Sequence, residues 1–272
     1  MTSPIPLEDK FADIVGKALR GLRLSKADLA TRSGVAEEDV RALLEGGFSA
    51  PVARAVAPVL GLGAETLVAC GLEQWRPMPV EVAGLACFQT AFEDMMVNSY
   101  LAYDAASGCA VAFDTGSDGS DMLSFLAARA LRLELILLTH SHGDHIFDLD
   151  RLKEKTGAPA WIGGREPVEG AAEFDAGHAF TCGNLRIETR LTWGHSKGGI
   201  TYVIGGLERP VAVVGDAVFA GSMGGGGVSY LDALRTNREQ ILSLPEATVL
   251  CPGHGPLTTV GEEKANNPFF TV

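Results

Sequence analysis

Three of the chain's six histidines lie within the six-residue segment His140-Ser141-His142-Gly143-Asp144-His145. The apolar run Leu135–Leu138 comes directly before this segment and predicts a buried strand that delivers the histidines at its carboxyl end. Neutral imidazole nitrogens and carboxylate oxygens are ligands for zinc, iron and manganese. The segment therefore restricts the chain to folds that gather such side chains at one edge of a sheet.

Three later segments repeat this arrangement of a strand-like stretch followed by a ligand-type side chain. They are residues 190–193 before His195, 211–214 before Asp216, and 248–251 before His254. An ordinary scatter of six histidines would not place five of them after strand ends. Because α/β folds carry their sites at the carboxyl ends of strands, we expect these side chains to meet at one edge. The seven candidate ligands are His140, His142, Asp144, His145, His195, Asp216 and His254. Seven ligands exceed the needs of one tetrahedral ion and suit two ions about 3.5–4 Å apart.

The order of residue types divides the chain into a helical domain (residues 1–74), a linker (75–79) and an α/β domain (80–272). Apolar residues recur at helical spacing between Phe11 and Leu19, Ser25 is placed as an N-cap, and Gly34 is expected to end the helix that follows. Pro77 and Pro79 suit neither a helix nor a central strand, which marks the linker. Beyond it, four short apolar strands are predicted near residues 110–113, 135–138, 211–214 and 248–250, with a helix over 122–131.

The helical segment resembles the helix-turn-helix of Cro/repressor-type regulators. The resemblance rests on Leu29-Ala30, Gly34-Val35, Val40, Leu43-Leu44 and Glu45-Gly46. The expected recognition helix, however, opens with Glu37, Glu38 and Asp39, which would repel a phosphate backbone. Residues 1–74 carry 8 Lys+Arg and 10 Asp+Glu, a balance of −2. The sequence therefore favours a packing or oligomerisation module over nucleic acid as a partner.

The segment Thr139–His145 resembles the signature of the metallo-β-lactamase superfamily, and Gly194-His195, Gly215-Asp216 and Pro252–Gly255 follow in that family's order. The resemblance implies a four-layer αβ/βα sandwich with the metals between the edges of its two sheets. By motif position, His140, His142 and His195 would hold one metal and Asp144, His145 and His254 a second, with Asp216 bridging the two.

The carboxyl-terminal tail resembles that of glyoxalase II-like hydrolases, which cleave hydroxyacyl-glutathione thioesters. The matching segments are Pro252–Thr259, Gly261–Lys264 and Asn267–Phe269. This resemblance implies hydrolysis of a small-molecule thioester by a metal-bridging hydroxide, with Asp144 steering the hydroxide as the catalytic residue. Two divalent ions are expected, zinc first, with iron or manganese as alternatives. The chain departs from these relatives at Gly225–Gly227, where glycines replace a polar loop; this leaves the substrate open and predicts either a surface loop or a lid.

Two other functions remain as alternatives. Some superfamily members oxidise persulfides with O₂ on a single iron held by two histidines and an aspartate; retention here of Asp144, His145 and His254 favours the two-metal site. The other alternative is a metal-dependent regulator that binds DNA through the helical segment. It is supported only by the presence of a helix-turn-helix-like domain and a metal-binding domain in one chain.

Charge and cysteine content suggest the compartment. The net charge is −12 and the pI about 4.9, no apolar run approaches the ~20 residues of a membrane-spanning helix, and Met1–Lys10 lacks the pattern of a secretory signal. The five cysteines form no close-spaced pair. We therefore expect a cytoplasmic protein without a membrane partner, and the absence of an export signal argues against a β-lactamase. A homo-oligomer is compatible with the sequence.

Overall fold

The amino-terminal region consists of helices, as the sequence predicts. The computed structural model describes residues 5–272. The five helices are α1 (Phe11–Gly21), α2 (Lys26–Ser33), α3 (Glu37–Leu44), α4 (Ala50–Leu60) and α5 (Ala64–Gly71). The Ser25 hydroxyl caps α2 by accepting the Asp28 N–H at 3.0 Å, and Gly34 ends the helix in the left-handed conformation at φ 70°. Both the predicted cap and the predicted break are confirmed.

The remainder of the chain forms two six-stranded sheets. The first sheet contains, in spatial order, β1 (Leu85–Phe92), β2 (Met95–Asp104), β3 (Cys109–Phe113), β4 (Arg132–Leu137), β5 (Ala160–Gly163) and β6 (Ala171–Phe174). The second contains, in spatial order, β12 (Thr258–Thr259), β11 (Val249–Pro252), β10 (Val211–Gly215), β9 (Ile200–Gly205), β8 (Leu185–Leu191) and β7 (Ala179–Cys182). The four strands predicted from apolar runs correspond to β3, β4, β10 and β11.

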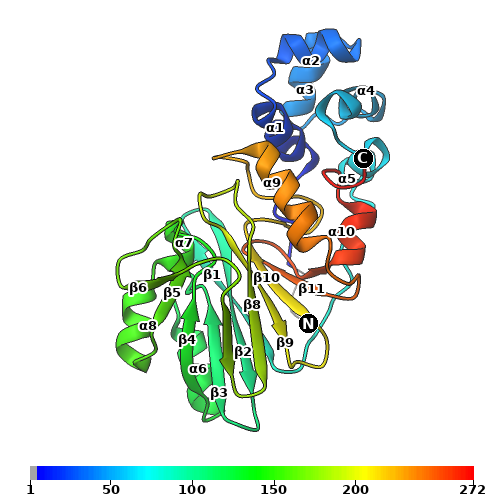
Figure 1. The fold of residues 1–272 in the computed structure, drawn as a ribbon. Helices are drawn as coiled ribbons and strands as arrows, with labels where there is room; N and C mark the ends of the chain where they lie inside the picture. Colours follow the sequence, from blue (N-terminus) through cyan, green and yellow to red (C-terminus); the bar gives the residue numbers. More distant parts are fainter. Residues whose placement is uncertain (1–4) are drawn as a thin grey trace.

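The two sheets pack face to face and are covered by helices on their outer faces (Figure 1). Apolar side chains such as Phe113, Tyr202 and Val213 fill the space between the sheets. The helices α6 (Ser120–Ala128) and α8 (Leu149–Thr156) cover the first sheet. The second sheet is covered by the π-helical turn η1 (Asn237–Ile241) and by α10 (Val260–Asn266), while α9 (Tyr230–Thr236), which leads into η1, packs against the amino-terminal helices. This confirms the expected four-layer αβ/βα sandwich preceded by a helical region.

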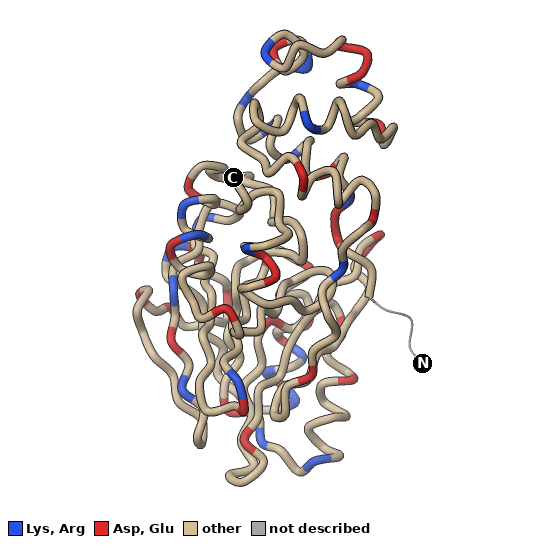
Figure 2. The backbone as a smooth tube through the Cα atoms, turned by 90° about the vertical axis from the view of Figure 1, so that its right-hand side faces the viewer, with Lys and Arg blue, Asp and Glu red and all other residues tan. Residues whose placement is uncertain are grey.

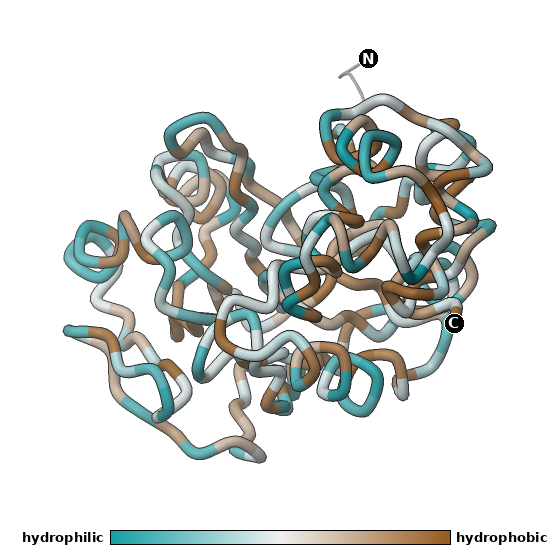
Figure 3. The backbone as a smooth tube through the Cα atoms, turned by 90° about the horizontal axis from the view of Figure 1, so that it is seen from above, coloured by the Kyte–Doolittle hydropathy of each residue, from teal (hydrophilic) through white to brown (hydrophobic). Residues whose placement is uncertain are grey.

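The helical region shares a hydrophobic core with the sandwich. Buried side chains of α1 to α5 pack in one cluster with Met223, Tyr230, Ala233 and Phe269. Viewed from above, the helices cover one side of the sandwich, close to the carboxyl terminus (Figure 3). The predicted boundaries at residues 74 and 80 fall in the irregular stretch between α5 and β1, so the division into domains stays a prediction about how the chain is organised.

No helix within residues 5–272 is both long and apolar enough to cross a membrane. All five cysteines are free thiols, and Cys109, Cys182 and Cys251 are buried, as expected of small apolar side chains.

Candidate metal centre

The structure brings all seven predicted ligands together where strands end at one edge of the sandwich. His140 and His142 follow β4, and Asp144 and His145 lie in the short helix α7 (Gly143–Ile146). The other three follow β8, β10 and β11. The ligands form two groups, and within each group the ligand atoms lie within 4.8 Å of one another: His140, His142, His195 and Asp216 in the first, and Asp144, His145 and His254 in the second.

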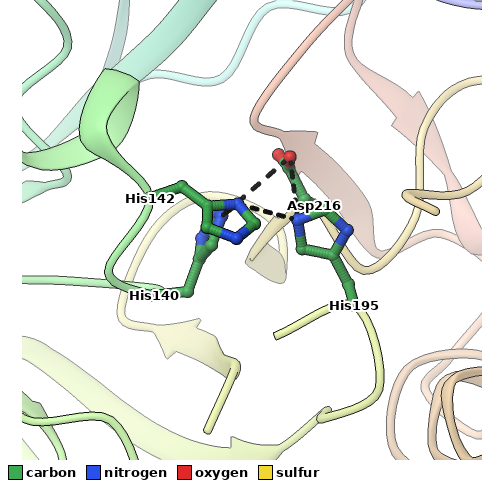
Figure 4. A group of neighbouring side chains, drawn as sticks. All are labelled: His140, His142, His195 and Asp216. Atoms are coloured by element: carbon green, nitrogen blue, oxygen red, sulfur yellow. Dashed lines mark hydrogen bonds and ion pairs between the residues drawn. The ribbon is translucent and has the colours of Figure 1, made fainter. Parts of the chain in front are cut away.

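In the first group, three imidazoles and one carboxylate point toward a common centre (Figure 4). His142 Nδ1 lies 2.9 Å from His140 Nε2 and 3.1 Å from His195 Nε2. Asp216 Oδ2 lies 3.4 Å from His195 Nε2. Neutral imidazole nitrogens that face each other so closely with their lone pairs repel, and a cation between them removes that repulsion.

In the second group, the Asp144 carboxylate faces two imidazoles. Its Oδ2 lies 3.2 Å from His254 Nε2 and 3.4 Å from His145 Nε2. Asp216 reaches this group too, since its Oδ1 lies 3.3 Å from His145 Nε2 and its Oδ2 lies 3.5 Å from His254 Nε2. Asp216 therefore faces both groups, which is the arrangement a bridging carboxylate needs.

Four of the histidines have a partner on their outer nitrogen that leaves Nε2 free for a metal. His195 Nδ1 contacts the Gly225 carbonyl oxygen at 2.9 Å, and His254 Nδ1 contacts the Met96 carbonyl oxygen at 2.7 Å. Since a carbonyl oxygen only accepts, Nδ1 carries the proton and Nε2 a lone pair. His140 Nδ1 contacts Thr139 Oγ1 at 3.0 Å, and His145 Nδ1 contacts Asp114 Oδ2 at 2.8 Å. Metal-ligating histidines are held in this way.

Two buried atoms at the centre lack any hydrogen-bond partner among residues 5–272: His145 Nε2 and Asp216 Oδ1. Buried polar atoms are almost always paired, because an unpaired one costs about 1–3 kcal/mol. A cation between these two atoms would satisfy both. The residues present therefore fit a bound metal.

The carboxylates of the centre favour positive charge on the groups beside them. Burial opposes protonation of His145, yet the Asp216 and Asp114 carboxylates raise the pKa of its imidazole to about 10. Burial likewise opposes protonation of His254, but Asp144 and Asp216 raise its pKa to about 11. Burial and the nearby charge of His145 hold the pKa of His140 well below its ordinary value. The carboxylates of the centre therefore favour positive charge beside them, which a bound cation would supply.

Glycines let the ligand loops approach each other closely. A Cβ atom at Gly253 would lie 2.2 Å from Asp216 Oδ1, and one at Gly224 would lie 2.0 Å from the Asp216 carbonyl oxygen. Gly224 is buried while Gly227 is exposed. The glycine-rich segment, which the sequence presents as a surface loop or a lid, therefore begins packed against two ligand-bearing segments.

Sequence reasoning missed Glu166, a buried carboxylate that joins two ligand loops. Its Oε1 accepts the Ser141 N–H at 3.1 Å and the Ser141 hydroxyl at 2.5 Å, and its Oε2 accepts the Gly198 N–H at 2.8 Å. Ser141 separates His140 from His142, and Gly198 follows His195. The remaining histidine, His178, is exposed and belongs to neither group of ligands.

Comparison with known proteins identifies the family. The family model described as "Metallo-beta-lactamase superfamily" matches residues 93–254, more than half of the chain. The chain belongs to this superfamily. A fold of this kind implies divalent metal binding, and the two groups of histidine and aspartate side chains could hold such ions.

Two curated relatives are enzymes by name. "Probable metallo-hydrolase YqgX" of Bacillus subtilis is 29% identical over 72% of this chain and 97% of its own length. "Hydroxyacylglutathione hydrolase GloC" of Haemophilus influenzae is 26% identical over 71% of this chain and 98% of its own length. The chain therefore belongs to a superfamily of metallo-hydrolases, and this membership indicates that it is an enzyme.

Two solved structures share the fold of this chain with similar TM-scores. The B3 metallo-beta-lactamase BLEG-1 has a TM-score of 0.61 at 29% identity, covering 69% of this chain and 100% of its own. ETHE1 from Myxococcus xanthus has a TM-score of 0.60 at 25% identity, covering 67% of this chain and 83% of its own.

Proposed function

We propose that the chain hydrolyses a small-molecule thioester, such as a hydroxyacyl-glutathione, with two divalent ions, zinc foremost, held by the seven ligands. One observation carries the proposal: the second ligand group is complete, and Asp216 faces it as well as the first. The likeness to the hydroxyacylglutathione hydrolase GloC supports the substrate class.

When bound, a pair of divalent ions would lower the pKa of a shared water and polarise the acyl carbonyl. The role of Asp144 follows from its surroundings. Burial opposes its ionisation, but the hydrogen bond with His254 and the charge of His145 keep its pKa below the ordinary value. An ionised Asp144 can accept a proton of the attacking water and fix its direction. Because a thiolate leaves readily, the reaction needs no strong general acid.

A mononuclear iron persulfide dioxygenase is the second candidate. Such an iron needs only two histidines and one carboxylate with open positions, and the first ligand group contains these types. The complete second group is superfluous in that chemistry, which is why hydrolysis is preferred.

One experiment separates the two candidates. The purified full chain, loaded with zinc or with iron, is analysed for metal per chain and then offered hydroxyacyl-glutathione thioesters and glutathione persulfide. Thiol release without oxygen uptake, at close to two ions per chain, is expected. Oxygen uptake with the persulfide, one ion per chain and no thiol release from any thioester would establish the dioxygenase instead.

A further inference from the structure

The segment Phe219–Gly225, named here the 219–225 loop, contacts two of the ligands through its backbone. The Gly224 N–H donates to the Asp216 carbonyl oxygen at 3.1 Å, and the Gly225 carbonyl oxygen accepts from His195 Nδ1 at 2.9 Å. A displacement of this loop would therefore disturb the hydrogen bond that orients the His195 imidazole and the main chain that carries the Asp216 carboxylate.

The amino-terminal region holds the 219–225 loop through two charged side chains. Lys17 Nζ donates to the Met223 carbonyl oxygen at 2.8 Å and forms an ion pair with Asp9. The Asp9 carboxylate accepts the Ser222 hydroxyl at 2.5 Å. Both side chains are largely buried, with 8% of Asp9 and 13% of Lys17 exposed. A residue of α1 and one of the segment before it thus bind two successive residues of the loop.

The same region also approaches the segment that carries His254, once through the Phe219 ring and once directly. Lys17 Nζ lies 5.1 Å from the centre of the Phe219 ring, which in turn packs edge-on against the His254 ring at 5.6 Å. Next to His254, a Cβ atom at Gly255 would lie 3.3 Å from the Glu8 backbone nitrogen. The segment before α1 therefore passes beside the His254 loop as well as the 219–225 loop.

Stability alone does not explain a buried ion pair at this place. Burying two charges costs several kcal/mol per ion before their attraction offsets it, and replacing a buried ion pair with apolar side chains is often neutral or stabilising. The shared core of the helical region and the sandwich already supplies apolar contact. What the pair adds is direction: its hydrogen bonds reach one particular carbonyl and one particular hydroxyl of the loop.

We propose that Asp9 and Lys17 are positioning residues for the metal centre, acting through the 219–225 loop on His195 and Asp216. The amino-terminal helical region, which precedes the residues that the family model matches, is then part of the catalytic unit. The inference rests on the proposed function only where turnover is measured, because ligand geometry can be followed without substrate.

The test uses the full chain and the substitutions Lys17→Met and Asp9→Asn, which remove charge and keep approximate shape. Arg54→Met is the matched control, since it breaks an exposed ion pair with Glu65 within the same helical region. Metal affinity is measured by chelator competition, and the ligand field by the absorption spectrum of the cobalt-substituted protein. Both variants are expected to bind one of the two ions about 10-fold more weakly with an altered cobalt spectrum. Lys17→Arg should restore part of the affinity, and the control should match the unsubstituted chain.

The thermal unfolding midpoint separates positioning from simple stabilisation. Wild-type metal affinity and cobalt spectra in both variants, whether or not unfolding shifts, would overturn the proposal. If Lys17→Met does not fold, the isosteric Asp9→Asn variant decides alone. Thiol release is measured last: a chain that hydrolyses no thioester but shows the expected spectral change refutes the proposed function and leaves this inference standing.

Discussion

His145 is held between two carboxylates: its Nδ1 contacts Asp114 Oδ2 at 2.8 Å, and its Nε2 lies 3.3 Å from Asp216 Oδ1. Asp114 also accepts the Thr139 N–H and hydroxyl, both at 2.7 Å, and Thr139 Oγ1 contacts His140. One buried carboxylate therefore orients a histidine of each ligand group.

Replacing Asp114 with asparagine should weaken metal binding. Asn tolerates the positive φ of 58° at this position, so the backbone is retained, but the negative charge that orients His145 and raises its basicity is lost. Affinity for metal should fall about 10- to 100-fold, measured by chelator competition. Asp118→Asn, which changes an exposed neighbour, is the control. Equal affinities in the two variants would contradict the role assigned to Asp114.

Replacing a ligand should affect turnover far more than replacing the isolated histidine. His142→Ala removes the nitrogen that faces both His140 and His195, and Asp216→Ala removes the carboxylate that faces both groups. In both variants kcat/KM for thioester hydrolysis should fall by more than about 100-fold. This loss is larger than the one expected when a hydrogen-bond partner of a ligand is removed. His178→Ala should stay within about two-fold. Elemental analysis of the same samples shows whether lost activity accompanies lost metal.

The ligands could be predicted from the sequence because each follows a local pattern, an apolar stretch that ends in imidazole or carboxylate. Their supporting contacts could not. The partner of His254 is the carbonyl oxygen of Met96, 158 positions away, and any residue could supply that atom. Glu166 stands in no recognisable motif, and its role exists only because the fold brings Ser141 and Gly198 to it. Asp9 and Lys17 are of residue types that usually lie exposed to solvent, and only the tertiary packing buries them.

Glu166→Gln should loosen the first ligand group. A glutamine keeps the size of the side chain but presents an amide NH₂ to one of two donors, the Ser141 or the Gly198 N–H, so one contact becomes repulsive. Of the two metal ions, the one with the lower affinity should bind about 10-fold more weakly. We also expect a lower kcat with little change in KM. Glu169→Gln, on the exposed part of the same loop, is the comparison. An unchanged kcat together with an unchanged metal affinity would show that the two ligand loops keep their positions without Glu166.

The helical region should show no sequence-specific DNA binding at physiological salt. Glu37, Glu38 and Asp39 are exposed on the first turn of α3, and Figure 2 shows acidic and basic residues interspersed along this region. Selection from genomic fragments followed by titration is the measurement, and a defined operator bound with nanomolar affinity would refute the expectation. Deletion of residues 1–74 should instead reduce solubility or change the oligomeric state, because it uncovers Tyr230 and Phe269.

Glu263 should make the stability of the metal-free chain depend on pH. Its side chain is fully buried in α10, and burial raises its pKa to about 7 although Thr258, Asn267 and Gly221 donate hydrogen bonds to it. Between the ordinary value near 4.5 and about 7, the native chain keeps a proton that the unfolded chain has lost. The contribution of Glu263 is therefore fully present below about pH 4.5 and falls as pH rises through 7, by on the order of 3 kcal/mol.

The substitution Glu263→Gln tests this sign, because glutamine cannot ionise. Urea unfolding of metal-free wild type and variant between pH 5 and 8 gives the difference in unfolding free energy at each pH. Wild type should lose stability relative to the variant as pH rises, whereas Glu154→Gln, on the exposed face of α8, should give a profile parallel to wild type. Since other titrating groups, including His145 and His254, are common to all three proteins, their contributions cancel in the comparison. A Glu263→Gln profile that also runs parallel to wild type would mean that Glu263 is ionised in the native chain across this range.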